Sequence, residues 1–187
     1  MLQTRIHGRG GQGVVTSAEL LAVAAFRDGR HAQAFPSFGS ERTGAPVVAF
    51  CRVDDRPIRA HEPIDAPDVV VIQDPTLLHQ VAVFDGLRDG GTIIINTGRE
   101  PAELGLGELA ESHRLVTVPA SALAREHLGR PLPGAPLLGA LAAITGVVTT
   151  ASLTAAIRER FSGAAADGNV AAAEAAYAWE VEHAGAA

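Results

Sequence analysis

The chain has 187 residues, of which 47% are hydrophobic and 19% are charged, which is enough apolar material for one buried core. We therefore expect a folded single domain over residues 1–187 rather than a disordered chain. Fifteen basic and 21 acidic side chains give a formal charge of −6, so the chain offers no basic surface to nucleic acid.

Two absences in the sequence narrow the class of protein further. Cys51 is the only cysteine, so an internal disulfide is excluded, and an iron–sulfur cluster, which needs about four thiolates, cannot be held by this chain alone. The N-terminus has no basic region followed by an apolar stretch, and no uncharged apolar run reaches about 18 residues. We expect a cytoplasmic protein without a membrane partner.

The first part of the chain predicts a strand, a turn and a helix, followed by two more strands. Residues 2–7 end in glycines, and residues 14–28 carry apolar side chains at helical spacing. Residues 31–35 and the β-branched run 45–53 (APVVAFCRV) predict strands. Between them, residues 35–44 (FPSFGSERTG) combine glycine, proline and polar side chains, which is typical of an ordered functional loop.

Two continuous apolar runs follow, residues 68–73 (DVVVIQ) and 92–96 (TIIIN), as expected for central parallel strands buried on both faces. A proline after Asp74 predicts a short capped helix over 76–80, and residues 114–118 (RLVTV) predict a last strand. The rest of the chain is expected to hold four helices, over residues 121–128, 137–147, 152–161 and 168–183. The stretches 162–167 and 185–187, rich in Ala and Gly, are expected to be mobile. This alternation predicts an α/β fold with a single doubly wound, mostly parallel sheet flanked by helices, Rossmann-like.

A glycine-rich segment separates the first expected strand from the first expected helix. Gly8, Gly10 and Gly13 fit the pattern GxGxxG in the strand-to-helix context that the pattern requires. Glycines let the backbone turn sharply, and the N–H groups of the first helical turn converge at the positive end of the helix dipole. The segment therefore predicts an anion site, most naturally for a phosphate, to which the hydroxyls of residues 16–17 and the guanidinium of Arg9 can add.

The same segment has a second interpretation, a tight turn that binds nothing, and the motif by itself leaves both open. A nicotinamide dinucleotide site would need an acidic side chain about 20 positions further on to hold the ribose hydroxyls. Asp28 precedes the second expected strand and Glu41 lies well past it, so the sequence disfavours NAD.

The loop before the third expected strand carries the polar run 40–44 (SERTG). Arg42 can form two parallel hydrogen bonds to a phosphate or carboxylate, which would make this loop a second contact for an anionic cofactor. A salt bridge from Arg42 to Glu41 or to another chain explains the same residues and is the stronger interpretation from the residues alone.

Other candidate reactive groups have structural explanations. The histidines are scattered without the spacing of a metal site, and Cys51 lies in an apolar strand where a low thiol pKa is not expected. The alternating charges of residues 52–59 predict a solvated hairpin or a subunit contact. Asp74, at the carboxyl end of a buried strand, either faces a ligand or caps a helix. We therefore expect no metal ligand and no catalytic residue in this chain.

Four blocks of the sequence, in order, resemble one known family. They are HGRGGQGVVTSAELLAVAAFRDG, AQAFPSFGSERTGAPVVAFCRVDDRPIR, DVVVIQDPTLL and LLGALAAITG, and they cover most of the chain to about residue 145. In content and spacing they are similar to the gamma subunits of pyruvate and ketoisovalerate ferredoxin oxidoreductases.

This resemblance implies a gamma subunit of a 2-oxoacid:ferredoxin oxidoreductase, inactive by itself, in a complex that converts a 2-oxoacid and coenzyme A into acyl-CoA, carbon dioxide and reduced ferredoxin. It implies alpha, beta and delta subunits as partners, with ferredoxin reached through the complex. Thiamine diphosphate, magnesium and the iron–sulfur clusters are then expected in those partner subunits rather than in this chain.

In this family the glycine-rich loop and the polar second loop approach the nucleotide end of coenzyme A. Carried over to this sequence, the resemblance implies coenzyme A contacts from Gly8, Arg9, Gly10, Gly11, Gln12, Gly13, Val14, Val15, Thr16, Ser40 and Arg42. One departure is Gly134, where similar chains carry asparagine in a sequence like PNTALLGA, so that a side-chain amide is lost. The small subunit of an indolepyruvate-type oxidoreductase and a stand-alone nucleotide-binding module remain the alternatives.

Overall fold

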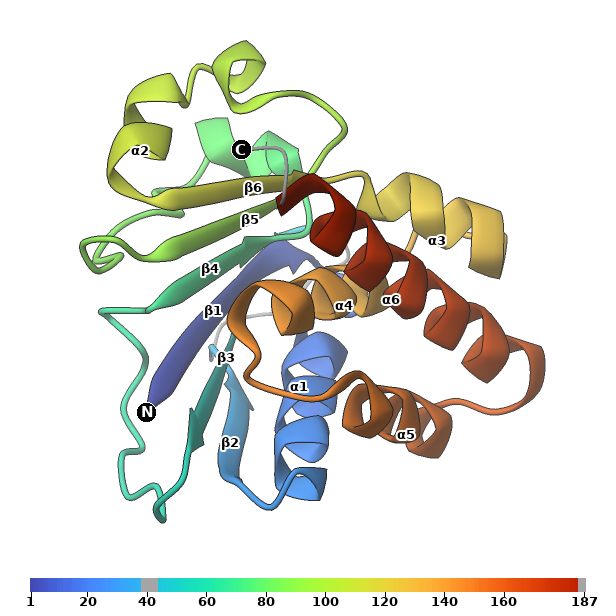
Figure 1. The fold of residues 1–187 in the computed structure, drawn as a ribbon. Helices are drawn as coiled ribbons and strands as arrows, with labels where there is room; N and C mark the ends of the chain where they lie inside the picture. The colour runs from blue at the N-terminus through green and yellow to red at the C-terminus, as the bar shows by residue number, and fades with distance from the viewer. Residues whose placement is uncertain (38–43, 185–187) are drawn as a thin grey trace.

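The protein is described by a computed structural model, which covers residues 1–37 and 44–184 (Figure 1). In chain order the elements are β1 (Leu2–Arg9), α1 (Val14–Arg27), β2 (His31–Pro36), β3 (Pro46–Asp54), β4 (Val69–Ile72), η1 (Pro75–His79), β5 (Thr92–Asn96), η2 (Pro101–Leu104), α2 (Gly107–Ser112), β6 (Arg114–Val118), α3 (Ala120–Leu128), α4 (Gly134–Thr145), α5 (Thr150–Arg160) and α6 (Gly163–Ala184). The elements η1 and η2 are short 3-10 helices. Strands and helices alternate, so the predicted α/β class is confirmed.

The six strands form one sheet in the order β2-β3-β1-β4-β5-β6 (Figure 1). The pairs β1–β4, β4–β5 and β5–β6 are parallel. β3 is antiparallel to both of its neighbours, β1 and β2. The prediction of a mostly parallel sheet is confirmed. The reversal of β3 follows from the short connection after β2, because a parallel neighbour would need a long crossover.

The strand order differs from the dinucleotide-binding order, in which the second strand lies beside the first. Here β3 lies between β1 and β2. The Rossmann-like winding named from the sequence therefore stays a prediction, and the observed description is a mixed, mostly parallel sheet flanked by helices.

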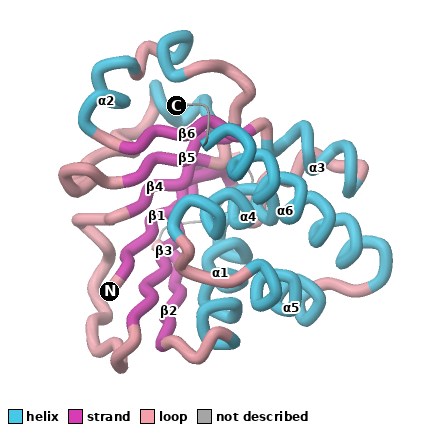
Figure 2. Tube along the Cα trace, in the orientation of Figure 1, coloured by secondary structure: helices cyan, strands magenta, loops and turns pink. Residues whose placement is uncertain are grey.

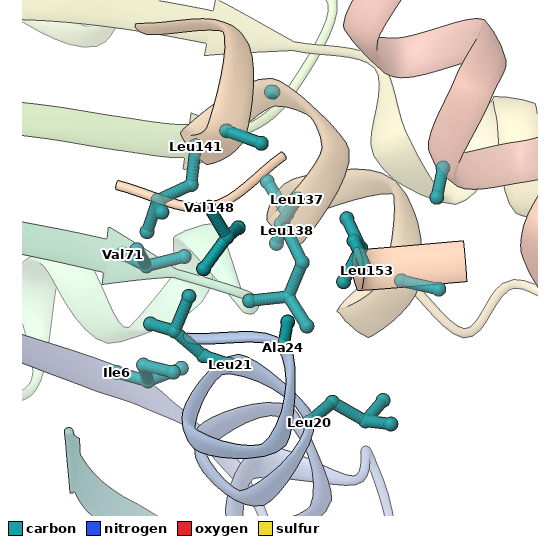
Figure 3. Close-up of a cluster of buried hydrophobic side chains, with 14 of the residues drawn as sticks. Ile6, Leu20, Leu21, Ala24, Val71, Leu137, Leu138, Leu141, Val148 and Leu153 are labelled. Carbon is teal, nitrogen blue, oxygen red and sulfur yellow. The ribbon is translucent and has the colours of Figure 1, made fainter. Parts of the chain in front are cut away.

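Helices cover both faces of this sheet (Figure 2). On one face, alternate strand residues such as Ile6 and Val71 pack against α1, α4 and α5, as Figure 3 shows for Leu21, Leu138 and Leu153. On the other face, the remaining alternate residues of β4 and β5 pack against the short helices η1, η2 and α2. β4 and the three central residues of β5 are apolar without interruption, as expected for strands whose two faces are both buried.

Two expectations from the sequence are wrong. The stretch 162–167 is not mobile, since α6 begins at Gly163 and its Ala166 is buried. Small side chains let α6 approach α4 closely: a Cβ on Gly139 would lie 2.0 Å from the carbonyl oxygen of Ala173. The sequence also failed to predict η2 and α2, because these short helices contain too few residues to show an apolar periodicity. The stretch 185–187 lies outside the described residues.

The charged run 52–59 is only partly a solvated hairpin. Arg52 is 1% exposed, and its guanidinium donates to the side-chain oxygen of Gln3 at 3.2 Å and to the carbonyl oxygen of Glu62 at 2.6 Å. Its side chain also lies over the ring of Phe35. Alternation along β3 places Arg52 on the face opposite its neighbours Cys51 and Val53, and there Gln3, Phe35 and Glu62 surround it.

Candidate functional site

The loop between β1 and α1 needs its glycines for two different reasons. Gly11 and Gly13 adopt left-handed backbone angles, with φ of 93° and 76°, which side chains disfavour. Gly8 is instead required by packing, because a Cβ there would lie 2.6 Å from Cγ2 of Val14. The glycine-rich pattern therefore both turns the chain and brings α1 close to the end of β1.

A polar network links the glycine-rich loop to the start of η1. The Gln12 side chain accepts from the N–H of Arg9 at 2.8 Å and donates to Asp74 Oδ2 at 2.9 Å. Asp74 also caps η1 by accepting from the N–H of Thr76 at 3.0 Å. The structure shows Asp74 in the capping role, and the same carboxylate also holds the glycine-rich loop.

The electrostatic state of Asp74 fits this role. Burial acts to raise the pKa of its carboxyl group, but hydrogen bonds from Thr76 and Gln12 and the charge of Arg9 outweigh burial and lower the pKa below its usual value. The group is therefore ionised at neutral pH, where it accepts from several donors at once.

The Arg9 guanidinium supports the loop through its hydrogen bonds. It donates to Asp74 at 3.1 Å, to the carbonyl oxygen of Gly44 at 3.0 Å, and to Thr76 and Gln80 at 2.7 and 2.8 Å. The sequence suggested that Arg9 adds a full charge to a bound anion. In the structure this charge is paired with Asp74 and lies against η1, and a contact from Arg9 to an anion stays a prediction.

The first turn of α1 presents main-chain donors that the protein leaves open. Gly13 precedes the helix without a side-chain cap, and only the N–H of Ser17 turns back to the Gly13 carbonyl oxygen, at 2.9 Å. The N–H groups of Val14, Val15 and Thr16 have no acceptor among residues 1–37 and 44–184. The Val14 side chain is buried, so this residue can contribute only its N–H. These groups converge at the positive end of the helix dipole.

A cavity of about 160 Å³ opens beside this helix terminus. Its lining combines the loop and α1 with residues from much later in the chain: Gly11, Gln12, Gly13, Thr16, Ser17, Leu20, Leu132, Gly134, Ala135, Phe161 and Asn169. The far wall is mostly apolar and was missed from the sequence, because no local pattern reports that residues near α4 and in α6 line one cavity with α1.

Gly134, the departure noted in the sequence, lies in that far wall. A Cβ on Gly134 would lie 2.6 Å from the Ser17 hydroxyl oxygen. That hydroxyl donates to the Gly13 carbonyl oxygen at 3.1 Å and accepts from the amide of Gln73 at 2.8 Å. The absent side chain therefore lets α4 approach the base of the glycine-rich loop. Gln73 was the sequence signal for this contact, as a polar residue at the end of an apolar strand.

The second loop is described only at its two ends, and both Ser40 and Arg42 lie outside the described residues. At one end, Ser37 donates its N–H to the carbonyl oxygen of Val48 at 2.8 Å. At the other end, the N–H of Gly44 donates to the Gly10 carbonyl oxygen at 3.2 Å. This end therefore lies against the glycine-rich loop.

Other reactive groups behave as expected for a structural role. Burial raises the pKa of the Cys51 thiol to about 12, so it is not a nucleophile. Burial, followed by the charge of Arg5, lowers the pKa of His7 to about 4, so His7 is neutral. Among the described residues no group of three His, Cys, Asp or Glu side chains is placed to hold a metal ion. No described helix is long and apolar enough to span a membrane.

Comparisons with known proteins agree with the resemblance found in the sequence. Residues 3–179 match the family model of pyruvate ferredoxin/flavodoxin oxidoreductase. The chain is 49% identical over 177 residues to the pyruvate/ketoisovalerate oxidoreductases common subunit gamma of Thermococcus kodakarensis, with 95% of this chain and 96% of that protein covered. It belongs to this gamma-subunit family. The gamma subunit is also 46% identical to pyruvate synthase subunit PorC of Methanothermobacter marburgensis, over 99% of this chain and all of that protein.

Solved structures extend the comparison to the fold. Pyruvate oxidoreductase subunit PORC of Thermotoga maritima is 33% identical, with a TM-score of 0.79 over 95% of both chains. The 2-oxoglutarate:ferredoxin oxidoreductase of Magnetococcus marinus, solved with 2-oxoglutarate, coenzyme A and succinyl-CoA bound, gives a TM-score of 0.80 at 21% identity. The gamma subunit matches 31% of that longer chain with 97% of its own length. At this identity the second likeness concerns the fold.

Proposed function

We propose that this gamma subunit contributes coenzyme A contacts to a 2-oxoacid:ferredoxin oxidoreductase complex and catalyses no step itself. The observation that carries this proposal is the set of open N–H groups at residues 14–16, which converge beside a cavity. Three such donors at a helix N-terminus suit a phosphate group, and coenzyme A carries phosphates at its nucleotide end.

The proposal assigns separate roles to the residues of the glycine-rich loop. Gly11 and Gly13 give the backbone the shape that exposes the donors, and Thr16 can add its hydroxyl. Arg9 and Gln12 hold the loop in place through Asp74. Ser40 and Arg42 are proposed as the second contact, from a loop whose end at Gly44 lies beside Gly10.

The partners follow from the same proposal. Coenzyme A supplies the thiol that accepts the acyl group, while thiamine diphosphate, magnesium and the iron–sulfur clusters belong to alpha, beta and delta subunits, which pass electrons to ferredoxin. Cys51 is buried and is the only cysteine of the chain, so it offers no cluster ligand. We place the complex in the cytoplasm and treat residues 1–187 as one gamma-type domain.

The test is anaerobic purification of the tagged chain from its host, with mass spectrometry of the accompanying proteins and an assay of 2-oxoacid oxidation. We expect thiamine- and iron–sulfur-containing chains to copurify with an activity that requires coenzyme A. Selective oxidation of aryl 2-oxoacids would favour the indolepyruvate-type alternative. A chain recovered alone, without activity, would contradict the proposal and favour a stand-alone nucleotide-binding module.

A further inference from the structure

The outer edge of β6 leaves main-chain groups without strand partners. β6 is the last strand of the sheet, and no other described strand pairs with its far side. Its first residue, Arg114, donates its N–H to the carbonyl oxygen of Gly91 at 3.0 Å, on the β5 side. Successive residues of a strand point their main-chain groups to opposite sides, so the N–H and C=O groups of Leu115 and Thr117 face away from β5.

A groove of about 510 Å³, which we call the β6 groove, runs along this edge. Its lining comes from residues 114–117 of β6, from the segment before α2, and from the last turns of α6: Thr97, Gly98, Glu100, Pro101, Arg114, Leu115, Val116, Thr117, Pro119, Trp179, Glu180 and His183. Figure 1 shows this end of α6 close to β6. A narrow groove whose floor is a free strand edge has the shape that an extended peptide fills.

The α6 wall is both aromatic and acidic. The Trp179 and His183 rings stack with centroids 4.0 Å apart. Between them in sequence, Glu180 is 5% exposed, and among the described residues its carboxylate reaches one donor, the Arg114 guanidinium, at 3.5 Å. That guanidinium also donates to the carbonyl oxygen of Ile144 at 3.1 Å. The groove therefore contains a buried carboxylate with a long and shared ion pair.

The surroundings of Glu180 disfavour the ionised form of its carboxyl group. Burial raises the pKa of Glu180, and the charges of Arg114 and His183 only partly oppose the rise. A further cation placed in the groove would stabilise the ionised form, because a buried charge with an incomplete partner is costly.

We propose that the β6 groove receives an extended segment of another subunit of the complex, which pairs with β6 through its main chain and places a lysine or arginine against Glu180. The proposal rests on the proposed function, because that function supplies the neighbouring subunits. The N–H and C=O groups of Leu115 and Thr117, which have no main-chain partner among the described residues, give the pairing. An apolar side chain of the same segment fits against Trp179.

A second copy of this chain fits the groove less well. Pairing β6 with the β6 of another copy would bring that copy's α6 and its residues 97–101 toward the walls of the groove. It would also bring a second buried Glu180 into the same region, where like charges repel. An extended segment without flanking elements avoids both problems.

The main test is Thr117→Pro in the assembled complex, with Thr117→Val as the matched control. Proline at 117 removes a donor that faces the groove and keeps every bond to β5, whereas valine keeps the donor and the β-branched shape. We expect Thr117→Pro to lower the amount of copurified partner chains at least about tenfold, and Thr117→Val to leave it unchanged. Equal recovery with both variants would overturn the proposal, while wild-type copurification would still support the proposed function.

A second measurement identifies the occupant without relying on the proline variant. Benzoylphenylalanine placed at His183, which is exposed in the wall of the groove, should crosslink on illumination of the wild-type complex. We expect the crosslinked peptide to come from another subunit and the link to persist with Thr117→Val. A link to a second copy of this chain, or no link within an intact complex, would reject the proposed occupant.

Discussion

The start of α1 and the outer edge of β6 both carry main-chain polar groups without a partner among the described residues, and the two places differ in geometry. At the start of α1, three N–H groups converge on one point beside a small cavity. Along the outer edge of β6, donors and acceptors alternate in a line at Leu115 and Thr117. N–H donors that converge suit an anion, whereas N–H and C=O groups that alternate along a strand suit another peptide backbone. The same chemical groups thus serve different ligands because secondary structure arranges them differently.

The two places also differ in what supports them. The helix terminus depends on glycine conformations and on a buried network through Gln12 and Asp74. The β6 groove is built from an ordinary strand and helix, whose positions are set by the core. Changes around the glycine-rich loop should therefore alter stability and coenzyme A use together, whereas changes at Thr117 should alter assembly alone.

The largest effect is expected from Gly8→Ala, which attacks the packing beneath the helix terminus. The new Cβ would lie 2.6 Å from Val14 and 3.1 Å from the Gln12 side chain, so α1 must shift. We expect the free energy of unfolding to fall by about 3 kcal/mol in a urea titration. Gly107→Ala is the control, because a Cβ there meets no atom within 4 Å and should change stability by less than about 1 kcal/mol. Equal unfolding midpoints would show that Gly8 is not required by packing.

A smaller effect on stability is expected when the pH is lowered, because His7 in β1 is buried in its neutral form. The pKa of His7 is lowered to about 4 by burial and then by Arg5, whereas an unfolded histidine titrates near 6.5. Between these values the unfolded chain binds a proton that the folded chain does not, so stability falls as pH falls from 6.5 toward 4. From pH 7 to pH 4.5 this should remove about 2 kcal/mol.

The matched variant for this pH effect is His7→Gln, which keeps an acceptor for the Arg5 Nε–H, now 3.1 Å from His7 Nε2. Its free energy of unfolding should change much less over the same range. The carboxyl group of Asp74, whose pKa is lowered, loses its stabilising effect only at more acidic pH and does so in both proteins. Parallel pH profiles for the two proteins would show that the proton uptake occurs elsewhere.

The smallest effect is expected from Asp74→Ala, which loosens the network without removing any proposed contact. Gln12 and Arg9 lose their shared acceptor, so the loop no longer presents its donors in one arrangement. In the assembled complex the KM for coenzyme A should rise about fivefold, near 1 kcal/mol, with kcat little changed. Asp167→Ala, which breaks an exposed pair with Arg158, is the control. An equal KM in both variants would mean that the network does not position the loop.

The sequence predicted those parts of the molecule in which local pattern and burial coincide. β4 and β5 were found because of their continuous apolar runs, and the glycine-rich loop because Gly8, Gly10 and Gly13 fit a strand-to-helix pattern. The burial of Cys51 was also predicted, and the structure confirms it.

The parts that were missed depend on contacts between distant residues. Arg52 was read as a solvated charge because its neutral oxygen partners, including Gln3, are far away in sequence. The cavity wall at Phe161 and Asn169 appears only when α5 packs against α1 and α6 packs against α4. The reversal of β3 was also missed, although the short connection after β2 favours it.

The most direct test of the account compares two glycines with nearly equal backbone angles. Gly13 has φ of 76° and sets the first turn of α1, whereas Gly129 has φ of 72° and ends α3. Alanine at either position introduces a similar strain of about 1–2 kcal/mol. The measurement is the coenzyme A dependence of 2-oxoacid oxidation by the assembled complex carrying each variant.

We predict that Gly13→Ala raises the KM for coenzyme A about tenfold, while decarboxylation measured without coenzyme A is unchanged. Gly129→Ala should leave both reactions as in the wild type. If the two variants show the same coenzyme A dependence, the helix terminus at Gly13 is not the coenzyme A contact, and the central claim is wrong.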